Sequence, residues 1–155
     1  MVLAPGSALF SGWFEGSFFS DGSLYIWDSL SPTMDQIFHR VDLHASFCEW
    51  SPSGNALVFS AYPIGGQTHP PDIYTIGLDT KTLVQLTDTE YVDRFLQWSP
   101  SSTYIVFRRQ SLTEAERPIH IQVINTRTGA SGDGSPYPHA SGVHFWTPVL
   151  GAPFR

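Results

Sequence analysis

Histidine is the residue type in this chain with the widest choice of chemistry, because its ring can bind a metal ion or carry a proton near neutral pH. The chain has six histidines, and two pairs share one spacing: His39 with His44, and His139 with His144. A metal pair built at this spacing needs a helix or nearby cysteines, and neither region offers them. We therefore interpret the histidines as scattered surface or strand residues and expect no metal site.

Acidic and basic residues form two further small groups. Asp88, Glu90 and Asp93 lie close together in the sequence and could attract a cation. They lack the D-x-D-x-D-G spacing of a calcium loop. The densest basic stretch is Arg108-Arg109, and acidic residues nearby offset its charge. Both groups are interpreted as solvated loops, and no cofactor is expected.

Serine is abundant, and an activated serine acts as a nucleophile when a base is held against it. The sequence contains no Gly-x-Ser-x-Gly elbow, which positions the serine of α/β-hydrolases. Ser51, Ser53, Ser99 and Ser101 occur in Ser-Pro segments typical of strand-to-strand turns, where hydroxyls cap backbone groups. We therefore expect no catalytic residue and do not expect an enzyme.

Net charge and the length of apolar runs exclude some classes of partner. The net charge is −6, which argues against nucleic acid as a partner because phosphate binding needs a basic face. No apolar run approaches the roughly 18 residues that span a membrane. The first residues show no signal-peptide pattern, so the compartment stays open, with the cytoplasm slightly favoured. The single cysteine, Cys48, cannot form an intramolecular disulfide and is expected to be a buried, inert thiol.

A repeat with a fixed period organises these residues. The segment Cys48–Gly54 returns as Leu96–Ser102 and again as His144–Pro148, so its tryptophan stands at positions 50, 98 and 146, a period of 48 residues. Each of the first two copies continues with a turn, an alternating apolar run, a long polar loop and a second apolar run. Several strands in a period of about 20–50 residues are typical of a β-propeller blade.

The expected fold is therefore all-β: one propeller segment of four-stranded antiparallel blades, spanning residues 1–155. The blades should cover about 2–46, 47–92 and 93–141, and about 142–148 should form a spare first strand. The first blade should be weak, because Leu3 stands where its tryptophan should be. The fourth strand of the third blade should be short or missing, because residues 130–136 have almost nothing apolar to pack.

Residues at equivalent places in the copies should form the core between blades. A four-stranded sheet has two apolar faces, and only neighbouring sheets can cover them. The expected core residues are Trp50, Phe59, Tyr74, Trp98, Phe107 and Trp146.

These segments resemble the TolB-like propeller repeat, whose blade usually reads W-S-P-D-G, then I-A-F-S, I-Y-V-M-D and R-L-T. The matching segments are Trp50–Gly54, Leu57–Ser60, Ile73–Ile76 and Gln85–Thr87, with Ser53 in place of the usual Asp. The resemblance covers nearly the whole chain and is specific for the fold rather than for a function. It implies blades like those of periplasmic binding proteins and of prolyl-oligopeptidase-like enzymes, which carry their nucleophile on a separate α/β domain that this sequence lacks.

The blade loops are where a binding surface is expected. The segment Trp13–Phe19 has four aromatic residues where the blade plan places the loop between the second and third strands; the equivalent loops are 62–71 and 109–118. Such loops should gather on one face, and clustered aromatic residues there would bind a partner. The alternative is that the rings fold back as strand extension and core. The candidate binding residues are Trp13, Phe14, Phe18, Phe19, Tyr62 and His69.

The expected function is a non-catalytic binding or assembly module that recognises a protein or peptide through this loop face. Two alternatives stay open: a propeller fragment of a larger prolyl-oligopeptidase-like peptidase, and small-molecule or sugar binding in the propeller channel. The expected partner is a second copy of the chain. Three blades are too few for a ring, and a homodimer would close one of six. A fragment of a longer propeller has equal support.

Overall fold

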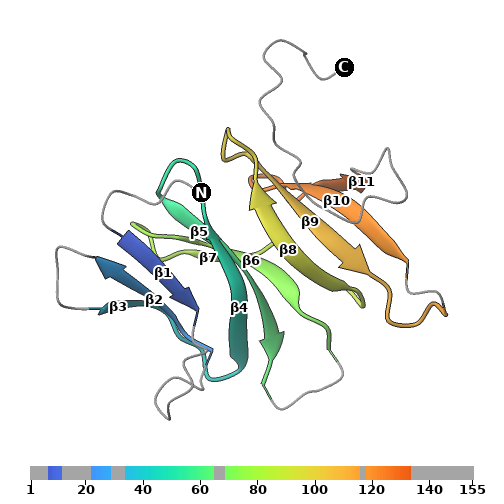
Figure 1. Ribbon diagram of the computed structural model, residues 1–155, viewed down its shortest axis with the longest axis horizontal. Coiled ribbons are helices and arrows are strands. Elements are labelled where there is room, and N and C mark those ends of the chain that lie inside the picture. The colour runs from blue at the N-terminus through green and yellow to red at the C-terminus, as the bar shows by residue number, and fades with distance from the viewer. Residues whose placement is uncertain (1–6, 12–21, 29–33, 65–68, 116–117, 134–155) are drawn as a thin grey trace.

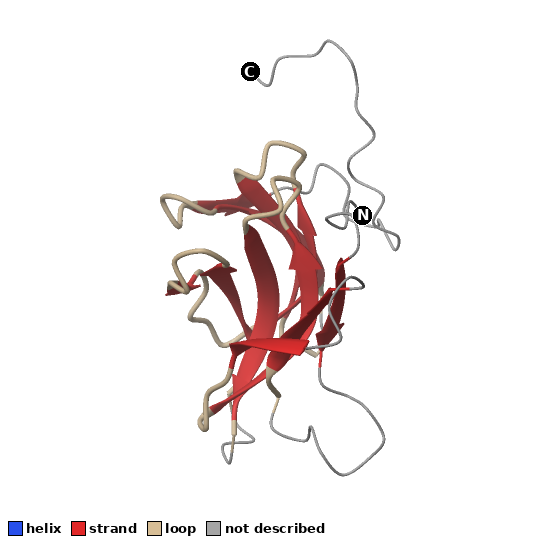
Figure 2. Cartoon of the chain, turned by 90° about the vertical axis from the view of Figure 1, so that its left-hand side faces the viewer, coloured by secondary structure: helices blue, strands red, loops and turns tan. Residues whose placement is uncertain are grey.

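The computed structural model describes residues 7–11, 22–28, 34–64, 69–115 and 118–133. Within these ranges every regular element is a strand, and the strands form three antiparallel sheets (Figure 1, Figure 2). The expected all-β class, built of antiparallel blades, is thereby confirmed. The same ranges contain no helix long and apolar enough to cross a membrane.

The middle sheet, blade 2, is a meander in which each strand pairs with the next along the chain. Its strands are β4 (Leu43–Trp50), β5 (Ala56–Pro63), β6 (Asp72–Gly77) and β7 (Leu83–Gln85). The register places Trp50 opposite Leu57, and Phe59 opposite Tyr74. Trp50, Phe59 and Tyr74 thus lie on three neighbouring strands of one sheet.

The third sheet, blade 3, repeats this meander. Its strands are β8 (Val92–Trp98), β9 (Tyr104–Gln110), β10 (Ile119–Asn125) and β11 (Ser131–Asp133). The last strand has three residues and pairs with β10. A short fourth strand is what the apolar-poor segment 130–136 predicts.

The first sheet, blade 1, has three described strands in the order β1-β2-β3. They are β1 (Ser7–Ser11), β2 (Leu24–Asp28) and β3 (Met34–Phe38). Residues 2–5, expected as a stub of its first strand, lie outside the described residues, as do Trp146 and the expected spare strand at 142–148.

Buried serines build the turn that joins the first two strands of blades 2 and 3. The Ser51 hydroxyl accepts a hydrogen bond from the Ala56 amide at 3.1 Å, and the Ser99 hydroxyl accepts one from Tyr104 at 3.0 Å. Each turn needs a residue at positive φ, which is Gly54 (76°) in one and Ser102 (57°) in the other. The Ser-Pro motif is therefore a turn-forming motif in both copies.

An apolar cluster joins blade 1 to blade 2. Leu24 and Phe38 of blade 1 are buried against Leu57, Phe59 and Tyr74 of blade 2. The ring centroids of Phe38 and Phe59 are 4.8 Å apart, and those of Phe59 and Tyr74 are 5.8 Å apart. Stacked and tilted rings at these separations add to the stability that burial provides.

A second apolar cluster joins blade 2 to blade 3. Val58 and Ile73 of blade 2 are fully buried with Trp98, Ile105 and Phe107 of blade 3. Because successive side chains of a strand point to opposite faces, Val58 belongs to this cluster while its neighbours Leu57 and Phe59 belong to the other. Blade 2 is therefore covered on both faces.

The two repeat tryptophans are not equally buried. Trp98 is 7% exposed, and its indole Nε1 donates to the Glu49 carbonyl at 3.4 Å. Trp50 packs against the first cluster but is only half-buried, and its Nε1 has no hydrogen-bond partner within the described residues. Trp50, the less buried of the two, faces blade 1, which has three described strands. Trp98, the more buried, lies in the joint between the four-stranded blades 2 and 3.

This difference predicts unequal costs of removing the two side chains. Trp98→Ala should lower the free energy of unfolding by about 3–5 kcal/mol, because it leaves a cavity between blades 2 and 3. Trp50→Ala should cost clearly less. Urea unfolding followed by circular dichroism measures both, with the exposed Val41→Ala as the control. Equal losses for the two tryptophans would contradict the unequal packing.

Candidate functional site

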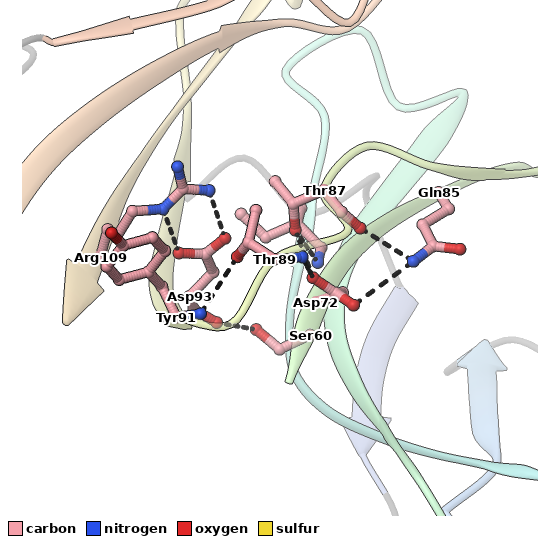
Figure 3. A network of polar contacts seen from close by, with 9 residues as sticks. Ser60, Asp72, Gln85, Thr87, Thr89, Tyr91, Asp93 and Arg109 are labelled. Atoms are coloured by element: carbon pink, nitrogen blue, oxygen red, sulfur yellow. Dashed lines mark hydrogen bonds and ion pairs between the residues drawn. The ribbon is translucent and has the colours of Figure 1, made fainter. Parts of the chain in front are cut away.

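Two connections leave blade 2 at the same end, because its strands are antiparallel: β5–β6 and β7–β8. We call this the connection end, and the opposite end, with the tight turns, the turn end. A network of polar side chains fills the connection end where blades 2 and 3 meet (Figure 3). Its members are Ser60, Asp72, Gln85, Thr87, Thr89, Tyr91, Asp93 and Arg109.

The centre of this network is a bidentate ion pair. The Arg109 guanidinium donates to both carboxylate oxygens of Asp93, at 2.8 and 2.7 Å. The Asp93 side chain is 0% exposed and that of Arg109 is 16% exposed. The guanidinium carbon also lies 5.4 Å from the centre of the Tyr91 ring and 5.3 Å from that of Phe107. The hydrogen bonds to Asp93 raise the pKa of Arg109 further above its ordinary value.

Two backbone contacts tie this pair to blade 2. The Ser60 hydroxyl donates to the Asp93 carbonyl at 3.2 Å, and the Asp93 amide donates to the Pro71 carbonyl at 3.3 Å. Ser60, Pro71 and Asp93, the three residues that make these contacts, are all buried. The start of β8 is thus fixed to blade 2 by directional bonds, in addition to the apolar cluster.

The ion pair departs from the repeat. Asp93 and Arg109 stand opposite each other in the register of blade 3. In blade 2, one period earlier, Ala45 and Ala61 stand opposite each other, and both are 1% exposed. The same place in two blades therefore holds an apolar pair at one joint and an ion pair at the other. A buried ion pair is often no more stabilising than apolar residues of similar volume. The need for stability therefore does not explain why this joint has an ion pair where the other joint has two alanines.

A second buried carboxylate lies beside the pair. Asp72 accepts hydrogen bonds from the Thr87 hydroxyl at 3.1 Å, the Thr89 amide at 3.2 Å and the Gln85 side-chain amide at 3.3 Å. Burial raises the pKa of Asp72 above its ordinary value, and the nearby charge of Asp93 acts in the same direction. The hydrogen bonds from Thr87 and Thr89 oppose this rise.

An exposed pair of aromatic rings lies farther along the first strands of the two blades. Phe47 and Phe95 are 51% and 52% exposed, and their ring centroids are 5.9 Å apart. They come together because β4 and β8 lie next to each other (Figure 1). The guanidinium carbon of Arg108 lies 5.4 Å from the centre of the Phe95 ring. We call Phe47 and Phe95 the aromatic pair.

Both rings of the aromatic pair stand on strained backbone. Phe47 has φ 47° and Phe95 has φ 56°, in the left-handed region that bulky residues rarely adopt. Each lies at a shift of the strand register, between Ser46 and Glu49 in β4 and between Arg94 and Gln97 in β8. Such a conformation costs of order 1–3 kcal/mol and persists only where the surroundings enforce it. Its recurrence one period apart makes the bulge a feature of the repeat.

The candidate residues expected from the sequence are placed only in part. Tyr62 is half-buried on β5, and its ring stacks on His44 at a centroid separation of 4.8 Å. His69 is exposed in the β5–β6 connection, so both belong to the connection end. Four of the candidate residues lie outside the described residues: Trp13, Phe14, Phe18 and Phe19.

The interpretation of the acidic and basic groups as solvated loops is wrong for three residues. Asp93 lies within β8, and Arg108 and Arg109 lie within β9. The ion pair between Asp93 and Arg109 is buried. In the sequence Asp93 lies near Asp88 and Glu90, which suggests one acidic loop. Its partner Arg109 is 16 residues away, so the pairing cannot be seen from neighbouring residues. Within the described ranges, no three His, Cys, Asp or Glu side chains come together as metal ligands.

No protein-family model and no curated protein matches the sequence. Among solved structures, a protein assigned as TolB from Agrobacterium tumefaciens is similar, with a TM-score of 0.65, 19% identity and 83% of this chain covered. An oligogalacturonate lyase in complex with manganese has a TM-score of 0.63, 18% identity and 84% coverage. A prolyl endopeptidase structure has a TM-score of 0.51, 15% identity and 68% coverage. This likeness establishes the fold: the chain folds as blades of a β-propeller like those of TolB.

The chain spans less than half the length of these structures: 44% of the Agrobacterium tumefaciens protein, 33% of the lyase and 17% of the endopeptidase. They include enzymes and a TolB protein, so the shared fold does not select a function.

Breaking the ion pair on one side should be worse than removing it. Arg109→Ala leaves a buried, unpaired carboxylate and should lower the free energy of unfolding by about 3–5 kcal/mol. The double variant Asp93→Ala/Arg109→Ala copies the Ala45 and Ala61 pair of blade 2 and should recover a large part of that loss. Chemical unfolding measures both.

The exposed ion pair between Arg40 and Asp42 provides the matched control. Arg40→Ala should leave unfolding almost unchanged, because water already solvates both charges. If the double variant is less stable than Arg109→Ala, the ion pair itself stabilises the joint, and the comparison with blade 2 does not hold.

Proposed function

We propose that the chain is a non-catalytic binding module that holds a segment of a partner protein against the first strands of its blades. The observation that carries this proposal is the aromatic pair. The two phenylalanine rings are half-exposed and touch each other on strained backbone. Burial in the core therefore does not explain why they stand there. Aromatic and arginine side chains are the residue types that contribute most to protein recognition.

The surroundings of the pair favour a peptide segment over other ligands. Arg108 adds a cation beside Phe95, so the surface offers apolar contact together with charge-assisted hydrogen bonding. Each register shift disrupts the β4–β5 or β8–β9 ladder locally. β4 and β8 are edge strands of their sheets, and an extended chain can bind a sheet edge through main-chain hydrogen bonds. The net charge of −6 disfavours nucleic acid as the partner.

The loop residues of the connection end extend this surface in the proposal. His69 is exposed there, and Tyr62 lies on the strand that leads to it. A partner that lies along β4 toward its start reaches the connection end, because His44 and Tyr62 pair across β4 and β5 at that point. The loop face expected from the sequence and the aromatic pair are then two parts of one binding surface.

We propose that two copies of the chain present this surface as part of one closed ring. The described part of the chain has three sheets arranged side by side as a fan (Figure 1). Propellers close with about four to eight blades. A second copy of the chain would close a ring of six and cover the outer faces of the end blades.

Replacing the aromatic pair should abolish binding without unfolding the protein. We expect Phe47→Asn/Phe95→Asn to weaken binding by at least about 30-fold, as for aromatic hot-spot residues. Stability should be unchanged or slightly higher, because asparagine tolerates positive φ. The probes are peptides selected from a random library on the unaltered chain, measured by fluorescence polarisation.

Tyr104→Asn is the matched control, because Tyr104 is an aromatic residue 42% exposed at the start of β9, at the turn end and away from the proposed surface. It should bind the selected peptides like the unaltered chain. Selected peptides that bind the Phe47→Asn/Phe95→Asn variant equally well would overturn the proposal.

Ring closure by two copies predicts a solution mass of twice 17.2 kDa. Light scattering after size exclusion measures this mass over a range of concentrations. The dimer should persist at low micromolar concentration, because closing the ring buries two apolar sheet faces. A stable monomer at all concentrations would refute the six-bladed ring.

A further inference from the structure

A cavity of about 260 Å³ lies at the turn end of the joint between blades 2 and 3. It is at the opposite end of the strands from the ion-pair network, because its residues come from the tight turns and the strand ends beside them. The residues that line it are Ser51, Asn55, Ala56, Thr75, Gly77, Thr80, Thr82, Val84, Trp98, Ser102 and Thr126. We call it the joint cavity.

The polar side of the joint cavity is rich in hydroxyl and amide groups and contains no charged side chain. Among the described residues, the hydroxyls of Thr75 and Thr82 have no hydrogen-bond partner in the protein. Asn55 uses its amide oxygen to accept from Ser51 and Ser53, which leaves its NH₂ group for a ligand. These groups both donate and accept, so they suit a ligand that does the same.

The apolar side of the joint cavity consists of Ala56, Val84 and part of the Trp98 indole. Val84 is 43% exposed and stands opposite Thr75 in the register of β6 and β7, so an apolar and a hydroxyl group lie side by side. The hydrogen bond from the Trp98 Nε1 to Glu49 fixes the indole in place. A ligand would therefore meet an apolar wall and hydroxyl groups in one small space.

Gly77 lies against Thr80 in the wall of the joint cavity. A Cβ atom added to Gly77 would lie 2.5 Å from the Thr80 hydroxyl oxygen. One period later the corresponding residue is Asn125, whose side chain accepts hydrogen bonds from the amides of Arg127 and Thr128. In blade 2 the Thr80 hydroxyl occupies the space beside Gly77, and in blade 3 the Asn125 side chain caps the equivalent turn.

We propose that the joint cavity binds a neutral monosaccharide. A sugar ring has hydroxyl groups that both donate and accept hydrogen bonds, and C–H faces that pack on an indole or on aliphatic side chains. The volume is below the range of about 300–1,000 Å³ for drug-sized ligands, which fits a ligand of one ring. Phosphates and carboxylates are disfavoured because no cationic side chain lines the cavity and the chain carries −6.

The test is a titration of the ¹⁵N-labelled full chain with single sugars, followed by NMR. The probes are glucose, galactose, mannose and N-acetylglucosamine, with glucose 6-phosphate as the charged comparison and glycerol as the cosolvent control. Site-specific shifts are the readout, because sugars at high concentration stabilise any protein by exclusion from its surface. At least one neutral sugar should give saturable shifts at Thr75, Thr82 and the Trp98 indole N–H.

Three variants make the result specific. Thr75→Val and Thr82→Val keep the side-chain shape and remove one hydroxyl, so each should weaken binding by about 2- to 10-fold. Thr128→Val is the matched control, because Thr128 is the repeat counterpart of Thr80 in blade 3 and does not line the cavity. Its affinity should be that of the unaltered chain.

Three results would overturn the proposal. One is a response that stays linear with every neutral sugar and equals that of glycerol. Another is binding that Thr75→Val and Thr82→Val leave unchanged, which would place the sugar elsewhere. Tighter binding of glucose 6-phosphate than of glucose would also contradict a neutral site. None of these results bears on peptide binding at the aromatic pair, because that surface lies elsewhere on the strands.

Discussion

The structure depends on one constraint: a sheet of four strands with two apolar faces cannot leave either face in water. β5 shows it most directly, because Leu57 and Phe59 point toward blade 1 while Val58 points toward blade 3. Burying each such side chain contributes about 1.5–3 kcal/mol, so the sheets must stack. Stacking in turn brings the first strands β4 and β8 into contact, and with them Phe47 and Phe95. Blade packing thus explains why the two rings meet, and not why both positions carry exposed phenylalanine residues.

The two four-stranded blades can be compared position by position. Both four-stranded blades have the serine-capped turn and the bulge with a phenylalanine at positive φ. They differ at two places in the joint: Asp93 and Arg109 stand where blade 2 has two alanines, and Asn125 stands where blade 2 has Gly77. A difference at an otherwise repeated position cannot be explained by the fold, because the other blade folds without it.

Much of the fold could be predicted from the sequence, because the 48-residue period places every strand of blades 2 and 3 by reference to its copy. The bulges could not. A strand is predicted from the alternation of apolar and polar residues, and a bulge shifts this alternation by a single residue. In the sequence, Phe47 and Phe95 therefore look like ordinary strand residues. Their equal spacing from Trp50 and Trp98 was the available signal. The burial of Asp93 was also hidden, because it depends on a partner on the next strand.

The positions of the candidate sites follow from the same packing. Both faces of blade 2 are covered, so its side chains free to meet a ligand are those of strand ends, turns and bulges. A joint between two blades brings two sets of such residues together at each of its ends. At the connection end they are charged and already satisfy one another, as Arg109 does with Asp93. At the turn end they are neutral, and Thr75 and Thr82 keep hydroxyls that nothing in the described chain engages. The first end therefore holds the blades together, and the second retains hydrogen-bonding capacity that a ligand can use.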